Sequence, residues 1–366
     1  MSWLLLLAAA LLLSALVMPA AAGGGSQRVS ADRERGFVGR ESTVRLRAEF
    51  FLPAPAYWRL EWRGEHNLGL SPAVKSGFGW GGVVVEMSAT AVLRRRGVHA
   101  LPRARLFVRD ALGLRSSEVR LTAKGGAITV YPRIWRQLPP DLALTLLAEG
   151  PQARQLGLED ASRYRGTREY HPGDSLKRIH WKATAHHDRL MVREFSWVRA
   201  TGVWIYIDSG GASQVYLDHV AELSASLALR LAEQGLAVGL SWAGGSRSPA
   251  RGDDAMRALL AELARLDAVA KPGKVPLPPA GVNLLVLTQE APLDVIEGAL
   301  AARARAARVH LLLFPEGFFL RPGETGRPVW GKTKGMERLQ QKRSLLAAAG
   351  VYVHVFRGNE GVLFRR

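Results

Sequence analysis

Residues 163–195 gather the side chains best suited to binding, and we call them the signature unit. These thirty-three residues hold eight Lys or Arg, four Asp or Glu, four of the nine histidines, one Trp and two Tyr. So many polar groups leave no room for a continuous apolar face. Basic side chains at this density predict contact with an anionic partner, and we expect it to involve Lys177, Arg178, Lys182 and His186.

The histidines of the signature unit could also suggest a metal site. His180, His186 and His187, however, lack the i, i+4 spacing with a carboxylate that zinc-binding helices show. Trp181 stands among basic residues and could stack on a nucleotide base, but a Trp that packs a helix onto a sheet is the more common arrangement. We therefore expect satisfied or surface histidines and a packed Trp181.

Residues 326–333 fit the Gly-x-x-x-x-Gly-Lys-Thr spacing of a phosphate-binding loop. Such a loop must leave a strand directly, whereas the expected strand ends about a dozen residues earlier, Pro328 removes a backbone donor and Trp330 crowds the loop. The sequence contains no Gly-x-Ser-x-Gly elbow, and spacing assigns no pair of acids as general acid and base. We predict a protein that is not an enzyme and that uses neither a cofactor nor a small-molecule substrate.

Turn residues position the basic side chains of the signature unit. Pro172 and Gly173 favour a type II turn over residues 170–173, and Asp174 follows where a helix N-cap belongs. The spacing of Leu176, Ile179 and Ala183 predicts a short amphipathic helix over 175–185. A strand over 190–195 should complete the unit.

The order of these residues resembles the signature of a known family. The run Arg168-x-Tyr170-x-Pro172-Gly173-Asp174, followed by Arg-Ile-His-Trp-Lys-Ala-Thr-Ala at 178–185, is similar to the bacterial domain-of-unknown-function-58 (DUF58) family. Residues 94–98 and 109–114 are similar to what precedes that signature. One departure is His186, where the family usually has Arg, so a permanent cation is replaced by a side chain that titrates near neutral pH.

The resemblance implies a membrane-anchored protein with a von Willebrand factor A-like domain and a MoxR-type AAA+ ATPase as its partner. We therefore expect an adaptor that works in the assembly or maturation of protein complexes. In the signature unit, Asp174 would cap the helix or bond Arg168. Tyr170 and Trp181 would pack the unit onto its domain, while the basic side chains face outward.

The resemblance also directs attention to residues 208–213, because von Willebrand A domains that bind Mg²⁺ carry Asp-x-Ser-x-Ser after their first strand. A hard cation needs several oxygen ligands there, but Gly210 and Ala212 occupy both hydroxyl positions, and the later loop Thr288-Gln289 contains no Asp. We expect Asp208 to cap the next helix or to pair with a basic side chain. The metal site is therefore predicted to be degenerate, at Asp208, Ser209 and Ser213.

The formal charge of +18 favours anionic partners such as nucleic acid, acidic proteins or anionic lipid. Only nine of the 50 basic residues are Lys, so 50 − 9 = 41 are Arg, and this excess also fits a compositional bias of the genome. We therefore do not expect nucleic acid as the partner. The alternative function is a protein that binds phosphate, a nucleotide or nucleic acid through the basic cluster. The absence of Cys excludes disulfides and thiolate metal sites.

Residues 3–22 are apolar almost without interruption, and twenty helical residues span about 30 Å, the hydrocarbon thickness of a bilayer. We expect a single-pass anchor in the cell membrane. Basic residues first appear after the span, at Arg28 and Arg33, so the soluble domains should be cytoplasmic. A cleaved signal peptide with export is the alternative, favoured by the small residues at 20–22.

The remaining patterns divide the chain into domains. Residues 1–28 are expected to form the anchor and a flexible joint, and alternating segments with Gly and Pro predict an antiparallel β-sandwich over 29–130. Residues 131–198 would hold a junction and the signature unit. Over 199–366, strands alternate with helices, which favours a parallel, doubly wound sheet. The predicted fold is an α/β doubly wound (von Willebrand A-like, Rossmann-type) domain plus a small antiparallel β-sandwich and an N-terminal transmembrane helix.

Overall fold

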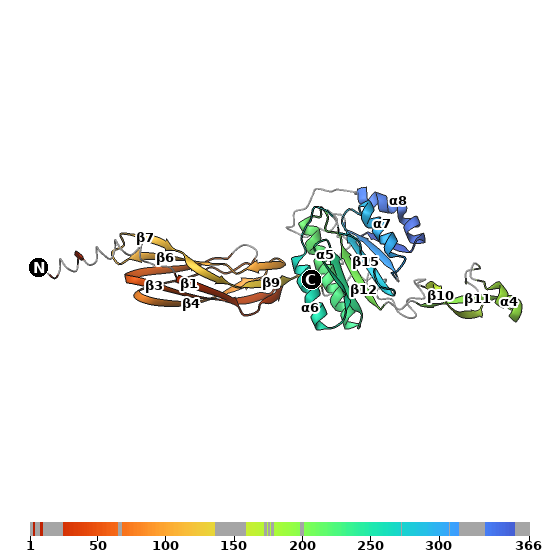
Figure 1. The fold of residues 1–366 in the computed structure, drawn as a ribbon, viewed down its shortest axis with the longest axis horizontal. Helices are drawn as coiled ribbons and strands as arrows, with labels where there is room; N and C mark the ends of the chain where they lie inside the picture. Colours follow the sequence, from red (N-terminus) through yellow and green to blue (C-terminus); the bar gives the residue numbers. More distant parts are fainter. Residues whose placement is uncertain are drawn as a thin grey trace. The chain divides into compact units, whose positions relative to one another are not determined.

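The structure is a computed structural model in which the chain divides into two compact units (Figure 1). One unit consists of Met1–Ile134 with Leu260–Leu266, and the other of Trp135–Leu259 with Asp267–Arg366. The structure describes residues 3, 8–9, 25–64, 68–135, 159–171, 174, 176, 179–197, 201–271, 273–306, 308–314 and 334–355. The domain bounds expected from the sequence stay predictions.

The first unit is built mostly from antiparallel strands. Its larger sheet has the order β7-β6-β3-β1-β8, and β4 also pairs with β3. A smaller sheet has the order β2-β9-β5. The strands of the larger sheet are β1 (Gly25–Ala31), β3 (Glu41–Trp62), β4 (Ala73–Val92), β6 (Ala104–Asp110), β7 (Ser116–Val119) and β8 (Leu121–Gly125). Those of the smaller sheet are β2 (Arg35–Phe37), β5 (Gly97–Ala100) and β9 (Ala127–Tyr131).

Alternation along β3 and β4 explains how the first unit buries its core. In β3 every second side chain from Ser42 to Leu52 is buried and the intervening ones point outward, as expected for a strand with one face on the core. β4 pairs with β3 from Glu41↔Val92 to Trp62↔Ala73. The register shifts between Leu52 and Ala56, where two prolines supply no backbone N–H.

The second unit contains a six-stranded sheet of order β14-β13-β12-β15-β16-β17. Neighbouring strands are parallel except β14, which is antiparallel to β13. The strands are β12 (Gly202–Ile207), β13 (Ala237–Trp242), β14 (Gly245–Ala250), β15 (Val282–Thr288), β16 (Val309–Leu313) and β17 (Val351–Val355). The helices that accompany them are α5 (Gln214–Glu233), α6 (Asp253–Arg265), α7 (Leu293–Ala302) and α8 (Lys334–Ala348).

The central strands of this sheet are apolar on both faces because helices cover both of them. Every residue of β12 and of β15 is buried. Side chains of α7 and α8, among them Val295 and Leu339, pack in one cluster with Tyr206 and Val286 of the sheet. Figure 1 shows α5 and α6 on the other side of the sheet. This arrangement places the carboxyl ends of β12 and β15 side by side, because these two strands are parallel neighbours.

The predicted fold class is wrong as a description of this structure. Among the described residues the structure is mostly β, with 45% strand and 26% helix, whereas we expected an α/β doubly wound domain, a small β-sandwich and a transmembrane helix. Strands of 22 and 20 residues at β3 and β4 account for much of the difference. The sequence indicated only short strands there, because Pro and Gly within both runs were taken for strand ends. The von Willebrand A-like assignment is not supported.

The predicted membrane anchor is also contradicted. No helix in the described part of the chain has both the length and the apolar character needed to cross a bilayer. Most of residues 3–22, on which the prediction rested, lie outside the described residues. The single-pass localisation expected from the sequence is therefore not supported. The loop-like run 326–333 also lies outside the described residues.

Candidate functional site

The signature unit is a β-hairpin with a short helix inserted between its strands. β10 (Glu159–Glu169) is antiparallel to β11 (Met191–Trp197), with Arg168 opposite Val192. On its other side Val192 forms a bridge with Ile179, and the His180 N–H donates to the Met191 carbonyl at 2.8 Å. Val192 and Ile179 are 2% and 7% exposed and form the apolar centre of the unit.

A bidentate ion pair closes the turn that follows β10. Both guanidinium Nη atoms of Arg168 donate to the Asp174 carboxylate, at 2.7 and 2.6 Å, and the His171 backbone N–H donates to it at 2.9 Å. The Arg168 hydrogen bond, followed by that from His171, lowers the pKa of Asp174 to about 2. Of the two roles expected for Asp174, the structure shows the bond to Arg168. Pro172 and Gly173, predicted to form this turn, lie outside the described residues.

The helix of the unit starts later than predicted. α4 spans Trp181–His187 and is capped by His180, whose Nδ1 accepts from the Ala183 N–H. The predicted helix is confirmed over 181–185, but its predicted start at residue 175 with Asp174 as N-cap is wrong. The physical reason is that Ile179 is extended and bridged to β11, so the chain can begin a helix only after it. Asp188 ends the helix in the left-handed conformation, with φ of 53°.

Trp181 is exposed, contrary to the prediction that it packs the unit onto its domain. Its exposed fraction is 68%, and no residue of α4 is buried. Leu176 and Leu190 are 66% and 43% exposed. The prediction failed because Ile179 and Val192 already fill the small centre of the unit. We call these three exposed apolar side chains of the unit, Leu176, Trp181 and Leu190, the apolar tip.

Basic side chains accompany the apolar tip. Arg189 reaches the Glu169 carboxylate at 3.7 Å, but both side chains are more than half exposed. Lys182 and Arg193 are exposed and have no carboxylate partner within the described residues. The exposed imidazoles of His186 and His187 meet edge to face at 5.2 Å. Lys177 and Arg178, the other predicted contact residues, lie outside the described residues.

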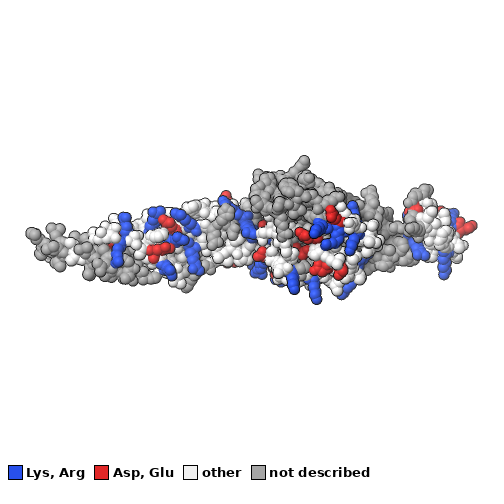
Figure 2. All heavy atoms as spheres, turned by 90° about the horizontal axis from the view of Figure 1, so that it is seen from above, with Lys and Arg blue, Asp and Glu red and all other residues white. Residues whose placement is uncertain are grey.

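Figure 2 shows that, among the described residues on the face it displays, acidic and basic side chains are interspersed. Some of the Arg residues in the first unit are paired with acids, as are Arg45 with Asp32 at 3.0 Å and Arg47 with Glu49 at 2.9 Å.

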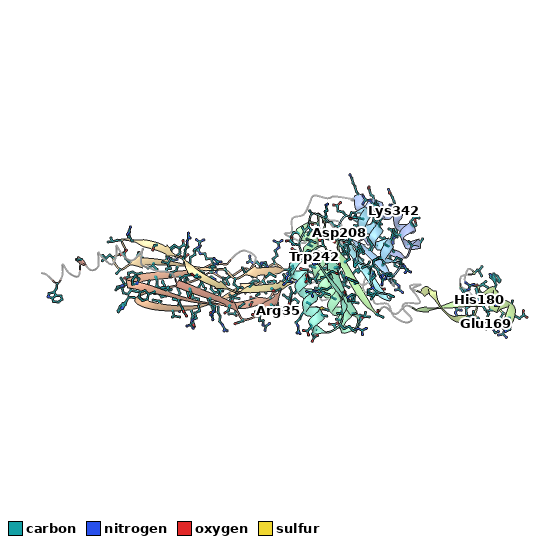
Figure 3. All side chains as sticks on the ribbon, in the orientation of Figure 1. Arg35, Glu169, His180, Asp208, Trp242 and Lys342 are labelled. Carbon is teal, nitrogen blue, oxygen red and sulfur yellow. The ribbon has the colours of Figure 1, made fainter. Side chains whose placement is uncertain are left out.

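The second predicted site, at Asp208, is a closed hydrogen-bonded cluster at one end of the sheet (Figure 3). Asp208 follows β12 and is 3% exposed. Its Oδ2 accepts from the Thr288 hydroxyl at 2.8 Å, and its Oδ1 accepts from the Gly210 N–H at 3.2 Å. Burial raises the pKa of Asp208, and the nearby carboxylates of Asp294 and Glu290 add to this shift while the two hydrogen bonds oppose it.

The structure corrects the role expected for Asp208. Its side chain does not cap α5, because Ser213 caps the helix by accepting from the Tyr216 N–H at 3.2 Å. Among the described residues it bonds Thr288 and Gly210 and no basic side chain. The Ser213 N–H in turn donates to the Gln289 side chain at 3.0 Å. Ser209 is fully buried, and its hydroxyl has no hydrogen-bond partner among the described residues. Across the part of the chain that is described, no three His, Asp or Glu side chains are grouped to hold a metal ion.

Sequence reasoning missed the part that Thr288 and Gln289 play in this cluster. The sequence analysis noted only that neither residue is the Asp that a metal site would need. In the structure their side chains connect the loop after β15 to the loop after β12. The available signal was a hydroxyl and an amide directly after a buried strand. Since parallel strands present their carboxyl ends at one edge, such groups are placed to bond across loops.

The solved structures that were matched resemble this chain only weakly. A non-cellulosomal cohesin from the archaeon Archaeoglobus fulgidus has 12% identity over 30% of this chain and 91% of its own, with a TM-score of 0.21. A FixG-related protein from Vibrio parahaemolyticus has 12% identity over 30% and 97%, with a TM-score of 0.19. Likeness at this level supports no conclusion about fold or function. No curated protein matches the chain.

A protein-family comparison bears directly on the signature unit. The family described as "Protein of unknown function DUF58" matches residues 166–284. This range begins within β10, includes α4, Asp208 and Ser213, and ends within β15, before Thr288 and Gln289. The match confirms, over this part of the chain, the resemblance to the DUF58 family predicted from Arg168, Tyr170, Asp174 and the run at 178–185.

Proposed function

We propose that this protein is a non-enzymatic interaction protein that docks a partner protein through the apolar tip of the signature unit. The observation that carries this proposal is Trp181, a large aromatic side chain that is 68% exposed on a helix without a single buried residue. Burying a Trp side chain stabilises a fold strongly. Trp181 is not buried within the described unit, so its apolar surface is available to a partner. Trp is also the residue type most enriched among residues that dominate binding energy at protein interfaces.

The construction of the signature unit supports a docking role. The bidentate pair between Arg168 and Asp174 holds the turn, and the bridge between Ile179 and Val192 holds the start of α4. The helix that carries Trp181 is thereby presented on an ordered base, which lowers the entropy cost of binding. Lys182 and Arg193, which have no carboxylate partner among the described residues, favour a partner with an acidic surface.

We further propose that the partner is a MoxR-type AAA+ ATPase, as the family resemblance implies. The protein would then act as an adaptor in the assembly or maturation of other protein complexes. An acidic patch on such an ATPase would face the basic side chains, while a pocket would receive Trp181.

The test measures binding of the purified full chain to the MoxR-type ATPase of the same genome. Trp181→Ala should weaken binding by about 30-fold, because truncating a central Trp typically costs about 2 kcal/mol or more. Its melting temperature should stay within about 1 °C of the wild type, since an exposed side chain contributes little to stability. Trp80→Ala is a matched control, because Trp80 is 71% exposed and lies in the first unit.

Equal binding by wild type and Trp181→Ala would reject the apolar tip as the docking site. Equal loss in Trp80→Ala would show that the effect is not specific to the signature unit. If the wild type binds no ATPase of this class but captures another protein through Trp181, the docking role stands and the assignment of the partner is wrong.

A further inference from the structure

A groove of about 670 Å³ lies on the outer face of the larger sheet in the first unit. Its walls come from β3, β4 and β6, with one residue contributed by β7. The volume falls within the range of about 300–1,000 Å³ that small-molecule and oligomer sites occupy. This groove lies outside the signature unit, so the inference is independent of the proposed function.

Strand register assembles an aromatic and a cationic group in one row across this groove. Tyr57 of β3 is paired with Phe78 of β4 on one side and with Arg109 of β6 on the other. Directly paired residues point to the same face of a sheet, so the three side chains lie next to one another on the outer face. The rings of Tyr57 and Phe78 are 4.8 Å apart, and the Arg109 guanidinium lies 5.5 Å from the centre of the Tyr57 ring.

The two rings are available to a ligand. Tyr57 is 46% and Phe78 is 52% exposed, although aromatic side chains on a sheet that serves only stability are usually turned inward. Phe107, half buried, extends the apolar floor of the groove. Ser76 and Ser116 add hydroxyl groups to the lining, so that ring surfaces alternate with hydrogen-bonding groups.

Arg109 is the cation of the groove that remains open to an anion. The other lining Arg, Arg59, is bonded to Glu61 at 2.9 Å, and Glu61 is also approached by Arg63 at 3.5 Å. Arg109 lies over the Tyr57 ring and next to Gly113, and it has no carboxylate partner within the described residues. Stacking on the ring restrains the guanidinium and leaves its N–H groups free to bind an oxygen anion in a bidentate manner.

We propose that this groove binds an oligosaccharide that contains a uronic acid, with the carboxylate on Arg109 and a sugar ring against Tyr57 and Phe78. Sugar rings have apolar C–H faces that pack on aromatic rings, and their hydroxyl groups require the donors and acceptors that Arg59, Glu61 and the two serines provide. A polyanion such as nucleic acid fits less well, because it needs several uncompensated cations. A purely apolar acid would leave the polar groups of the groove without partners.

The experiment is a calorimetric titration of the purified full chain with uronate trisaccharides, using trigalacturonic acid and the corresponding alginate and hyaluronan oligomers as probes. At least one of these probes should bind. Methyl esterification of its carboxylates should weaken binding by about tenfold or more, because a charge-assisted bidentate contact is lost. Arg109→Gln and Phe78→Ala should each lower affinity by about tenfold or more.

Trp80→Ala is the matched control, since Trp80 lies on β4 close to Phe78 in sequence but does not line the groove. It should bind like the wild type. Arg109 and Phe78 are surface side chains, and a circular dichroism melt of each variant separates loss of binding from loss of fold. The proposal is overturned if no uronate probe binds at millimolar concentration, if the methyl ester binds as well as the acid, or if Arg109→Gln retains affinity. It is also overturned if pentaglutamate binds as tightly as the best uronate, because the groove would then select charge and not sugar.

Discussion

Replacing Asp174 by Asn tests whether the bidentate pair with Arg168 holds the base of the signature unit. Asn keeps the size of the side chain but removes its charge. The difference between the ordinary Asp pKa of 3.8 and about 2 corresponds to about 2.4 kcal/mol. Because the Arg168 side chain is 41% exposed, solvent screens the pair. We therefore expect a local loss of about 1 kcal/mol, or about a fivefold rise in the opening equilibrium.

The assay is amide hydrogen exchange, which reports local opening. The Tyr170 N–H donates to the Leu190 carbonyl at 2.8 Å, next to the ion pair, and should exchange about fivefold faster in Asp174→Asn. Arg189→Gln is the control in the same unit, because it breaks only the exposed pair with Glu169 and should change exchange by less than about twofold. Equal effects of both variants, or no effect of Asp174→Asn, would refute the reasoning.

The dependence on pH has a definite sign. A carboxyl group whose pKa is lowered by folding stabilises the folded state above its unfolded pKa, and that stabilisation is lost as the pH falls through the folded value. The advantage of the wild type over Asp174→Asn should therefore be complete above about pH 5 and should diminish between 3.8 and about 2. Titration of the Asp174 carboxyl by NMR with a midpoint near 4 would contradict the role of Arg168.

Two further predictions concern buried titratable groups. The Asp110 side chain is 1% exposed and accepts hydrogen bonds from the N–H groups of Leu112, Leu114 and Arg115. Burial raises the pKa of Asp110, but these hydrogen bonds outweigh burial and lower the pKa below its ordinary value. Asp110→Asn should destabilise the chain by about 1–3 kcal/mol in urea unfolding at pH 7, and by less as the pH falls below 4; an unchanged unfolding midpoint would contradict this. Burial, with His354 and Arg308 nearby, lowers the pKa of His310 to about 3. The wild type should therefore lose stability as the pH falls from 6.5 towards 3. The His310→Phe variant should lose less stability over that range. If the melting temperatures of the two proteins fall in parallel with pH, the prediction is refuted.

The sequence carried local information that the structure or the family comparison bears out. Arg168, Tyr170 and Asp174 stand at fixed short separations, and this order was sufficient to predict the family resemblance that the match at 166–284 confirms. Turn formers, caps and alternation act between residues close together along the chain, and these signals can be read without a fold.

The errors at the signature unit arose where a distant strand decided the outcome. The spacing of Leu176, Ile179 and Ala183 is helical, yet Ile179 pairs with Val192 and α4 begins at Trp181. Trp181 was expected to be packed because Trp is usually buried, and its exposure depends on which other side chains fill the centre of the unit. Pairing with β11 overrode the helix propensity of Ile179, and packing of the centre decided the exposure of Trp181.

The amino-acid sequence by itself determined the family signature, the positions of many strands and helices, and the loss of both hydroxyl positions after Asp208. Only the tertiary structure decided that Asp208 bonds Thr288, 80 residues away, and that Tyr57, Phe78 and Arg109 form one row. The physical reason is that strand register, which no local pattern specifies across such separations, sets which side chains face one another. Exposure of Trp181 likewise follows from the packing around it and not from its own chemistry.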